Sequence, residues 1–523
     1  MNMAIKRGII VALGLGLQIL LSFSIYMFLI EHIAFINIII SVISILLVLA
    51  IIKNSKNYSY TLPWIIILVW FPLIGSILYI ILGRNKNKSK VLKSIVKSDK
   101  ESKKYLIQDP EIKEQFKENS RIKYISDFAG FPVTTNNEVN YYPIGEEAFE
   151  AMLEELKKAE KFIFLEYFII NQGKMWNSIL KILEEKAKKG VDVRVMYDDL
   201  GCLPTLDNSY PKELEKKKIK CVVFNKLKPF AGVIMNNRDH RKILVIDGKV
   251  AFSGGINLAD EYINKIVKYG HWKDNAIKIK GDAVWNYTVM FLSIWNSFRH
   301  EDGDYAKFKF NFESNANIET GESSENKANI KNDTNTQNKK INNGFVVPYG
   351  ETPLDEEFTG EDIYLNIINQ ANKYVYIITP YLIIDTDMIN ALNLAAKRGV
   401  DVRIVIPGIP DKKVVYTLSE SYMEPLIKGG VKIHKYTPGF AHSKVFVADD
   451  NVATVGTINM DYRSLYLHFE CGCYFENVDV IKDIKKDLDN TLARSHEVTL
   501  KEAVPNLIKG TWQALLRLVA PLM

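Results

Sequence analysis

Residues 240–247 read His-Arg-Lys-Ile-Leu-Val-Ile-Asp, and residues 442–449 read His-Ser-Lys-Val-Phe-Val-Ala-Asp. The histidine, lysine and aspartate have the same spacing in both stretches. A glycine and an asparagine follow each stretch at the same distances (Gly254 and Asn257; Gly456 and Asn459). A repeat of this kind sets the architecture of a chain. We therefore predict two related halves, each of which contributes a histidine, a lysine and an asparagine to one pseudo-twofold site.

The apolar run inside each copy predicts a β-strand, because it is short, rich in β-branched residues and bounded by polar residues. Alternate residues of a strand share one face, so His240 and Lys242 should project together, as should His442 and Lys444. A lysine ammonium has three donors that suit phosphate oxygens, and an asparagine amide on a following turn can donate to the same oxygens. The combination predicts a site in which an imidazole attacks an anionic phosphoryl group.

The repeat extends upstream of these motifs. Residues 187–195 are echoed by residues 396–404, and each stretch reads as a helix end, a glycine and a buried strand. Residues 162–168 are similarly echoed by the strand-like residues 375–381. Strands that alternate with helices predict an α/β/α sandwich in each half.

The paired motifs resemble those of the phospholipase D superfamily, and further stretches are similar to bacterial cardiolipin synthases. These stretches are residues 457–464, Phe469-Glu470, residues 197–201 and the N-terminal series Trp64, Pro72, Gly75 and Tyr79. The resemblance covers nearly the whole chain and implies two phospholipase-D-like halves that share one active site. Two departures keep hydrogen-bonding capacity: Lys273 stands where the family often has arginine, and His468 where it often has asparagine.

The resemblance implies phosphatidyl transfer through a covalent phosphohistidine, in which two phosphatidylglycerol molecules give cardiolipin and glycerol. In the family the N-terminal motif usually supplies the nucleophile, so we expect His240 to attack phosphorus and His442 to act as general acid and base. Histidine suits both roles because it titrates near neutral pH. The duplicated sequence alone leaves the two roles interchangeable. The alternative function is a membrane-bound hydrolase that passes the phosphatidyl group to water and releases phosphatidic acid.

The other site residues have different expected roles. Those expected to bind the phosphoryl oxygens are Lys242, Lys444, Asn257 and Asn459. Those expected to orient the histidines by accepting from their second nitrogen are Asp274 and Glu470. Asp247 and Asp449 complete the catalytic motifs, and we expect them to hold the strand–turn geometry. Glu166 and Tyr167 are further candidates for lining the site. We expect no metal ion and no cofactor, because no cluster has the spacing of metal ligands.

The first 83 residues are far more apolar than the rest and predict a transmembrane anchor of two or three spans. Residues 8–30, 33–52 and 62–82 are each long enough to cross a bilayer. A burst of basic residues follows from Arg84 to Lys104, and by the positive-inside rule it places the catalytic part in the cytoplasm. The chain is therefore expected to be a multi-pass protein of the cell membrane that acts on phospholipids.

The expected domain boundaries follow from changes in composition. They are an anchor at 1–83, a basic juxtamembrane linker at 84–135, a first half at 136–310, a disordered polar linker at 311–344, a second half at 345–500 and an amphipathic helix at 501–523. The polar linker has almost no large apolar residues and cannot offset its ordering entropy. The final helix could lie in the membrane interface or pack on the core, and the sequence favours neither.

Composition argues against other classes of protein. The net charge of +6 is modest. A nuclease or a partner of nucleic acid would be expected to have a basic face interleaved with aromatic residues, and the sequence shows no such pattern. The four cysteines show no zinc spacing, and reduced thiols fit a cytoplasmic domain. A non-enzymatic scaffold is disfavoured because both motifs are intact. The sequence makes no prediction of oligomeric state.

Overall fold

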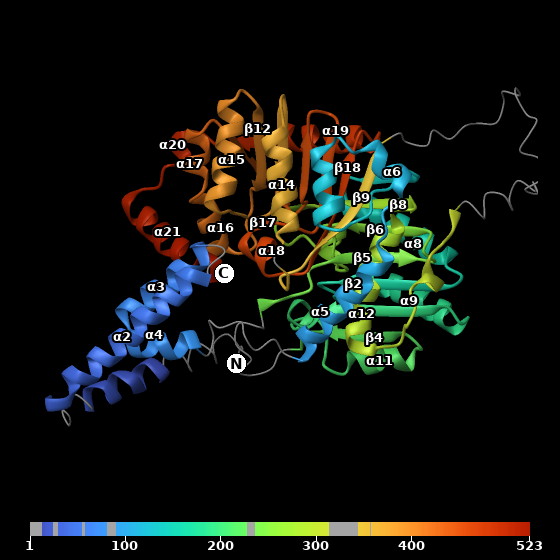
Figure 1. The fold of residues 1–523 in the computed structure, drawn as a ribbon. Helices are drawn as coiled ribbons and strands as arrows, with labels where there is room; N and C mark the ends of the chain where they lie inside the picture. The colour runs from blue at the N-terminus through green and yellow to red at the C-terminus, as the bar shows by residue number, and fades with distance from the viewer. Residues whose placement is uncertain are drawn as a thin grey trace, which may run out of the picture. The chain divides into compact units, whose positions relative to one another are not determined.

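The computed structural model describes residues 13–24, 30–54, 58–80, 90–226, 236–312, 344–355 and 357–522. They fall into two compact units, Met1–Asn87 and Lys88–Pro521, and each unit is described by itself. The polar linker expected at 311–344 lies outside the described residues except at its two ends. Figure 1 shows the arrangement of elements within each unit.

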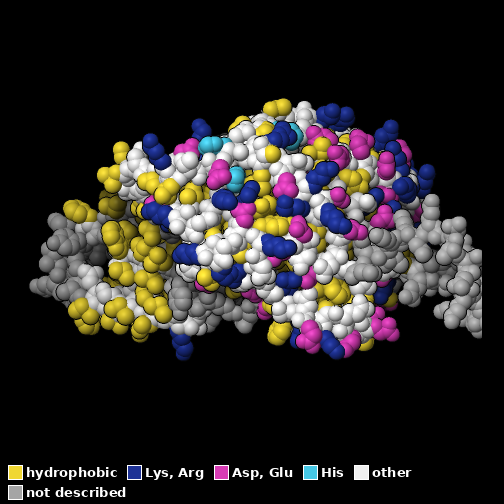
Figure 2. All heavy atoms as spheres, turned by 90° about the horizontal axis from the view of Figure 1, so that it is seen from above, with side chains coloured by type: hydrophobic (Ala, Val, Ile, Leu, Met, Phe, Trp, Pro, Cys, Tyr) yellow, Lys and Arg dark blue, Asp and Glu magenta, His cyan; other side chains and the backbone are white. Residues whose placement is uncertain are grey.

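The N-terminal unit is helical: residues 13–24 form a helix, followed by α2 (Ile30–Asn54), α3 (Tyr58–Trp70) and α4 (Pro72–Leu78). Among the described residues, Phe35–Asn54 is the one helical stretch long and apolar enough to cross a bilayer. The expected span at 8–30 is described only over 13–24. The expected span at 62–82 is interrupted at Phe71, because Pro72 lacks an N–H and starts a new helix. Figure 2 shows hydrophobic side chains gathered on these helices.

The first sheet of the larger unit has seven strands in the order β1-β8-β6-β5-β2-β3-β4. Their bounds are β1 (Asn137–Tyr142), β2 (Phe162–Tyr167), β3 (Asp192–Asp198), β4 (Lys220–Phe224), β5 (Lys242–Ile246), β6 (Val250–Gly254) and β8 (Ala276–Gly281). Strands β2, β3 and β4 are parallel, whereas β5 runs antiparallel to β2. The main helices of this half are α8 (Gly145–Lys158), α9 (Lys174–Lys188), α11 (Tyr210–Lys216) and α12 (Val284–Arg299).

The second sheet has eight strands in the order β19-β13-β12-β10-β15-β16-β18-β9. Their bounds are β9 (Phe345–Glu351), β10 (Tyr374–Ile378), β12 (Asp401–Pro407), β13 (Lys432–Tyr436), β15 (Val445–Ala448), β16 (Val452–Gly456), β18 (Glu470–Glu476) and β19 (Ser495–Glu497). The main helices of this half are α14 (Thr359–Gln370), α15 (Thr386–Lys397), α16 (Lys413–Glu420), α17 (Met423–Lys428) and α19 (Val480–Ala493). In each half, the strand that carries the histidine–lysine motif lies in the interior of its sheet.

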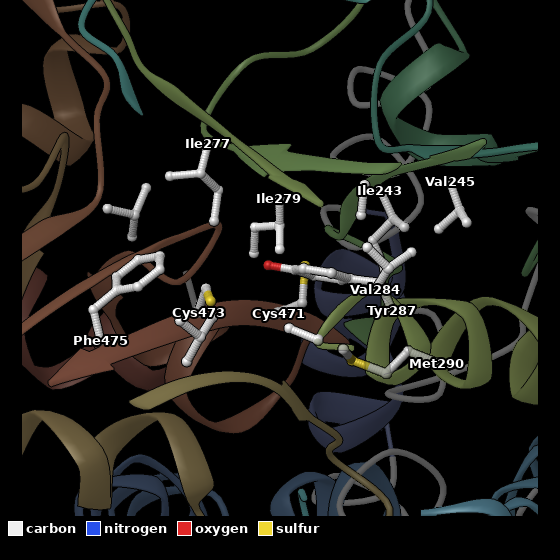
Figure 3. Packing of buried hydrophobic residues seen from close by; sticks show 14 of the residues in the cluster. Ile243, Val245, Ile277, Ile279, Val284, Tyr287, Met290, Cys471, Cys473 and Phe475 are labelled. Atoms are coloured by element: carbon white, nitrogen blue, oxygen red, sulfur yellow. The ribbon is translucent and has the colours of Figure 1, made fainter. Parts of the chain in front are cut away.

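One hydrophobic core joins the two sheets. Figure 3 shows Ile277 and Ile279 of the first sheet above Cys473 and Cys471 of the second, with Tyr287 of α12 beside Cys471. All four cysteines are buried and free. Because the inner faces of both sheets are buried in the same cluster, the two halves form one rigid frame for whatever lies at their common edge.

Part of the stretch expected as a basic linker at 84–135 is a packed helix. Helix α5 (Lys90–Ser102) buries Leu92 and Ile95 in the shared core. The Ser98 Oγ donates to the Ser293 carbonyl of α12 over 2.6 Å. The apolar residues recur at helical spacing among lysines, so one face of this basic segment is buried.

The C-terminal segment contains α20 (Leu500–Ala503) and the amphipathic helix α21 (Leu507–Val519). Polar groups attach α21 to α16: the Gln513 amide donates to the Thr417 carbonyl, and the Lys509 ammonium lies 2.8 Å from Glu420. Leu507 and Ile508 remain exposed in the larger unit. The helix therefore packs on the larger unit through Gln513 and Leu516 and leaves other apolar side chains exposed.

Candidate functional site

Each motif histidine is anchored to the backbone of the opposite half. The His240 N–H donates to the Phe469 carbonyl over 2.8 Å, and the His442 N–H donates to the Lys273 carbonyl over 2.7 Å. The second contact extends a parallel pair between β14 (Gly439–Ala441) and β7 (His271–Lys273). Both histidines therefore lie where the halves meet, at the start of their motif strands.

The two carboxylates predicted to orient the histidines do contact them, and the contacts cross between the halves. Both carboxylate oxygens of Glu470 lie 2.9 Å from the Nδ1 of His240. The Oδ2 of Asp274 lies 2.7 Å from the Nδ1 of His442. The Glu470 carboxylate also accepts a hydrogen bond from the Thr457 hydroxyl over 2.5 Å. Sequence reasoning did not single out Thr457, although it lies in the quoted stretch 457–464.

Burial and charge set the ionisation of these groups. Burial lowers the pKa of His240 to about 3 and that of His442 to about 4. Burial alone would raise the pKa of the Glu470 and Asp274 carboxyls, but the facing histidines outweigh it and both pKa values are lowered. Both imidazoles are then neutral at physiological pH beside charged carboxylates. A carboxylate at Nδ1 holds the proton on that nitrogen and leaves a lone pair on Nε2.

The motif lysines lie beside the histidines, as the spacing predicts. The Lys242 Nζ donates to the His240 carbonyl over 2.6 Å, and the Lys444 Nζ donates to the His442 carbonyl and lies 3.0 Å from its Nδ1. Burial lowers the pKa of Lys242 to about 8 and that of Lys444 to about 7. Two nearly buried ammonium groups beside the histidines favour an anionic ligand.

The two asparagines are not equivalent. The Asn257 Oδ1 accepts from the Ile169 N–H over 3.0 Å, and its Nδ2 donates to the Tyr262 hydroxyl over 2.7 Å. One N–H of Asn257 therefore remains for a ligand. The Asn459 Oδ1 has no hydrogen-bond partner among the described residues. The structure thus ties Asn257 into the fold and leaves the Asn459 amide oxygen open.

The motif aspartates lie at the opposite end of their strands from the lysines. Asp247 has a φ of 53° and accepts from the backbone N–H groups of residues 160–162. Asp449 has a φ of 52° and accepts in the same way from residues 372–374. This is the strand–turn geometry expected of them.

Of the other candidates, Glu166 does not face the histidines. Its carboxylate lies 3.8 Å from the Arg241 guanidinium, which leaves the chain on the opposite side from His240 and Lys242. Tyr167 is buried beside Lys242 in the β2–β5 register. The alternation of a strand could have separated these two candidates from the sequence alone.

Sequence reasoning gave no site role to two aromatic side chains next to the histidines. The His468 ring lies 5.7 Å from the His240 ring, and the Trp272 ring lies 5.4 Å from the His442 ring, between centroids. They occupy matching places, two residues before Glu470 and two before Asp274. The matching two-residue spacing before each orienting carboxylate was the available signal.

Comparison with known proteins identifies relatives over most of the chain. Residues 152–295 and 364–492 match the family described as "Cardiolipin synthase, PLD-like domain", and residues 39–84 match "Phospholipase_D-nuclease N-terminal". A protein of Clostridium perfringens named cardiolipin synthase is 34% identical, covering 90% of this chain and 95% of that protein. Cardiolipin synthase 1 of Staphylococcus aureus is 32% identical, covering 90% and 93%.

One solved structure supports the fold. The crystal structure of phosphatidylserine synthase from Haemophilus influenzae superposes with a TM-score of 0.54 and 15% identity, covering 77% of this chain and 98% of that protein. The two-sheet arrangement of the larger unit therefore recurs in a distant protein.

Proposed function

The chain belongs to the phospholipase-D-like family of cardiolipin synthases, and on that premise we propose how its site transfers a phosphatidyl group. The reaction joins two phosphatidylglycerol molecules into cardiolipin and releases glycerol. The observation that carries the mechanism is the crossed pairing of His240 with Glu470 and of His442 with Asp274. Two oriented imidazoles, each beside an ammonium group, suit in-line displacement at a phosphodiester, one as nucleophile and the other as proton donor.

In the first step, His240 attacks the phosphorus with the Nε2 lone pair. The bond from phosphorus to the glycerol headgroup oxygen breaks, and His442 delivers a proton to that oxygen, so that glycerol leaves. The incoming anionic phosphodiester favours the protonated form of His442 that this step needs. Covalent catalysis of this kind divides one difficult displacement into two easier ones.

In the second step, His442 accepts the proton of a hydroxyl on a second phosphatidylglycerol. That oxygen bonds to phosphorus as the bond to His240 breaks, which restores the free histidine. Lys242, Lys444, Asn459 and the remaining N–H of Asn257 are proposed to bind the phosphoryl oxygens through both steps and to stabilise the transition-state charge. Asp247 and Asp449 support the strands and do not contact substrate.

We also propose how the halves are related by symmetry and how the enzyme is placed in the membrane. The two halves are related by a pseudo-twofold axis that passes between the histidines, as the matched motifs and crossed contacts suggest. The N-terminal unit anchors the enzyme as a multi-pass membrane segment. The lysines of α5, which follow the anchor in the sequence, support a cytoplasmic catalytic unit by the positive-inside rule.

Lipid product analysis tests the function. Purified protein in phosphatidylglycerol vesicles should form cardiolipin and glycerol in equal amounts. The His240→Ala and His442→Ala variants should both lose this activity, with unfolding midpoints that show an intact fold. Phosphatidic acid as the sole phospholipid product would identify the enzyme as a hydrolase and overturn the proposal.

A further inference from the structure

A third histidine lies beside the catalytic pair. His468 precedes Glu470 by two residues, in the bend that leads into β18. The His468 Nδ1 lies 3.7 Å from the Glu470 Oε1, and that carboxylate also contacts His240. His468 is therefore adjacent to the reacting groups but takes no part in the two steps above.

The His468 ring is buried with one nitrogen unpartnered. The side chain is 9% exposed, its Nδ1 is paired with Glu470, and its Nε2 makes no hydrogen bond to any residue that the structure describes. Its backbone N–H is satisfied by the Arg463 carbonyl over 2.8 Å, so the unmet capacity belongs to the ring. A buried polar group without a partner is costly, and such groups in native proteins call for an explanation. Because the His468 ring also adjoins His240, a substrate atom at the site can complete the hydrogen bonds of its Nε2.

The chemistry of the ring indicates what kind of ligand atom fits. In the neutral ring, the Glu470 carboxylate on the Nδ1 side favours the tautomer with its proton on Nδ1. The His468 Nε2 is then an acceptor. A phosphoryl oxygen is also an acceptor and cannot bond to it, whereas a hydroxyl can donate to it.

The matching place in the other half has different chemistry. Trp272 precedes Asp274 as His468 precedes Glu470, and its indole packs against His442 and Tyr262. An indole N–H is only a donor, so Trp272 cannot accept from a hydroxyl. Of these two matching positions, His468 offers a hydrogen-bond acceptor and Trp272 does not.

We propose that the His468 Nε2 accepts a hydrogen bond from a hydroxyl of the glycerol headgroup. The inference rests on the proposed function and deepens it: His468 selects a polyol over water and over simple alcohols as the group that receives the phosphatidyl unit. Water and a monohydroxy alcohol cannot place one hydroxyl at phosphorus and a second at His468. Glycerol and the glycerol headgroup of phosphatidylglycerol can.

The test follows how the phosphatidyl-enzyme divides between acceptors. Full-length protein is given phosphatidyl-p-nitrophenol, whose leaving group needs no protonation, with glycerol and 1-propanol together in water. We expect the wild type to favour glycerol over 1-propanol. His468→Leu and His468→Phe, which differ in shape, should lower that preference by roughly 3- to 10-fold, the value of one hydrogen bond. His468→Asn should keep most of it, because the amide oxygen also accepts.

A matched control is His434, which is likewise buried without hydrogen bonds among the described residues but lies in β13, next to the edge strand β19 of the second sheet. His434→Leu should leave the preference unchanged. If His468 affects folding alone, its apolar variants should have a lower total rate of phosphatidyl transfer and the same preference for glycerol over 1-propanol as the wild type. That result would overturn the inference.

Two further outcomes separate the inference from its premise. If the wild type transfers no phosphatidyl group to any acceptor, the proposed function fails. If the wild type prefers glycerol and both apolar variants keep that preference, only the role of His468 fails. His240, His468 and Glu470 also lie within reach of one ion. A preference that a chelator abolishes would assign the three residues to a cation and overturn the hydroxyl site.

Discussion

Burial decides the charge of the side chains around the two histidines. An imidazole in water would be partly protonated near neutrality, whereas His240 and His442 are held neutral by their surroundings. Burial likewise lowers the pKa of both lysines. An anion that enters the site favours the charged ammonium and raises the pKa again. The sequence predicted the residue types and the orienting carboxylates. It did not predict that each carboxylate serves the histidine of the other half, because that pairing depends on how the halves dock.

The lysines predict the alkaline limb of the pH profile. A lysine is charged below its pKa, so raising the pH through about 7 to 8 removes the charges of Lys444 and Lys242 from the free enzyme. We expect kcat/KM to fall over that range, because kcat/KM reports ionisations of the free enzyme. Lys444→Arg, whose guanidinium stays charged, should move the fall to higher pH. A kcat/KM that stays constant to pH 9 would contradict this assignment.

The crossed carboxylates predict a loss of rate without a loss of fold. Glu470→Gln and Asp274→Asn remove the charge that holds each histidine, and kcat should drop by about 10²- to 10⁴-fold. The matched control is Glu351→Gln. Glu351 is a buried acid on the neighbouring strand β9, where burial raises the pKa of its carboxyl, and it has no contact with either motif histidine among the described residues. Equal effects of the three substitutions would show that the histidine contacts carry no special weight.

At the scale of elements, each motif strand ends in a turn whose aspartate, Asp247 or Asp449, has a positive φ. The short runs rich in β-branched residues predicted β5 and β15 as strands, and the structure confirms both and places them inside their sheets. The basic helix α5 was missed as a packed element because its lysines dominate the composition, while only Leu92 and Ile95 with their neighbours reveal the buried face. The helix break at Phe71 could be predicted only from Pro72, because the apolar run around it is continuous.

Asp247 predicts a stability effect that is distinct from catalysis. Asp247→Ala leaves three backbone N–H groups without their acceptor and puts alanine at a positive φ. We expect the free energy of unfolding to fall by roughly 2–4 kcal/mol, with kcat of the folded fraction little changed. Denaturant unfolding of the detergent-solubilised protein measures this, with the exposed Asp489→Ala as control. A large loss of kcat at unchanged stability would make Asp247 a catalytic residue instead.

At the scale of the molecule, one core and one site are built from both halves. Neither half contains a complete histidine pair with its carboxylates, and neither inner sheet face is buried without the other. The duplication in sequence predicted two halves and one site. It could not predict the shared core, because which faces of the two sheets meet is a property of the tertiary packing.

This arrangement predicts that the halves act only together. Fragments 1–312 and 344–523, produced separately, should each be inactive, and co-expression should restore cardiolipin synthesis in membranes. Co-expression of fragments in which either His240 or His442 is alanine serves as the control and should stay inactive. Activity from one fragment alone would contradict a site shared between the halves.

The central claim is that one histidine of this shared site carries the phosphatidyl group, and mass spectrometry of the trapped enzyme tests it most directly. With phosphatidyl-p-nitrophenol as donor, the His442→Ala variant can form the intermediate but lacks the base that discharges it. We predict a phosphatidyl adduct on His240 in this variant and none in His240→Ala. A wild-type enzyme that turns over the lipid while neither variant shows an adduct on a motif histidine would contradict the account.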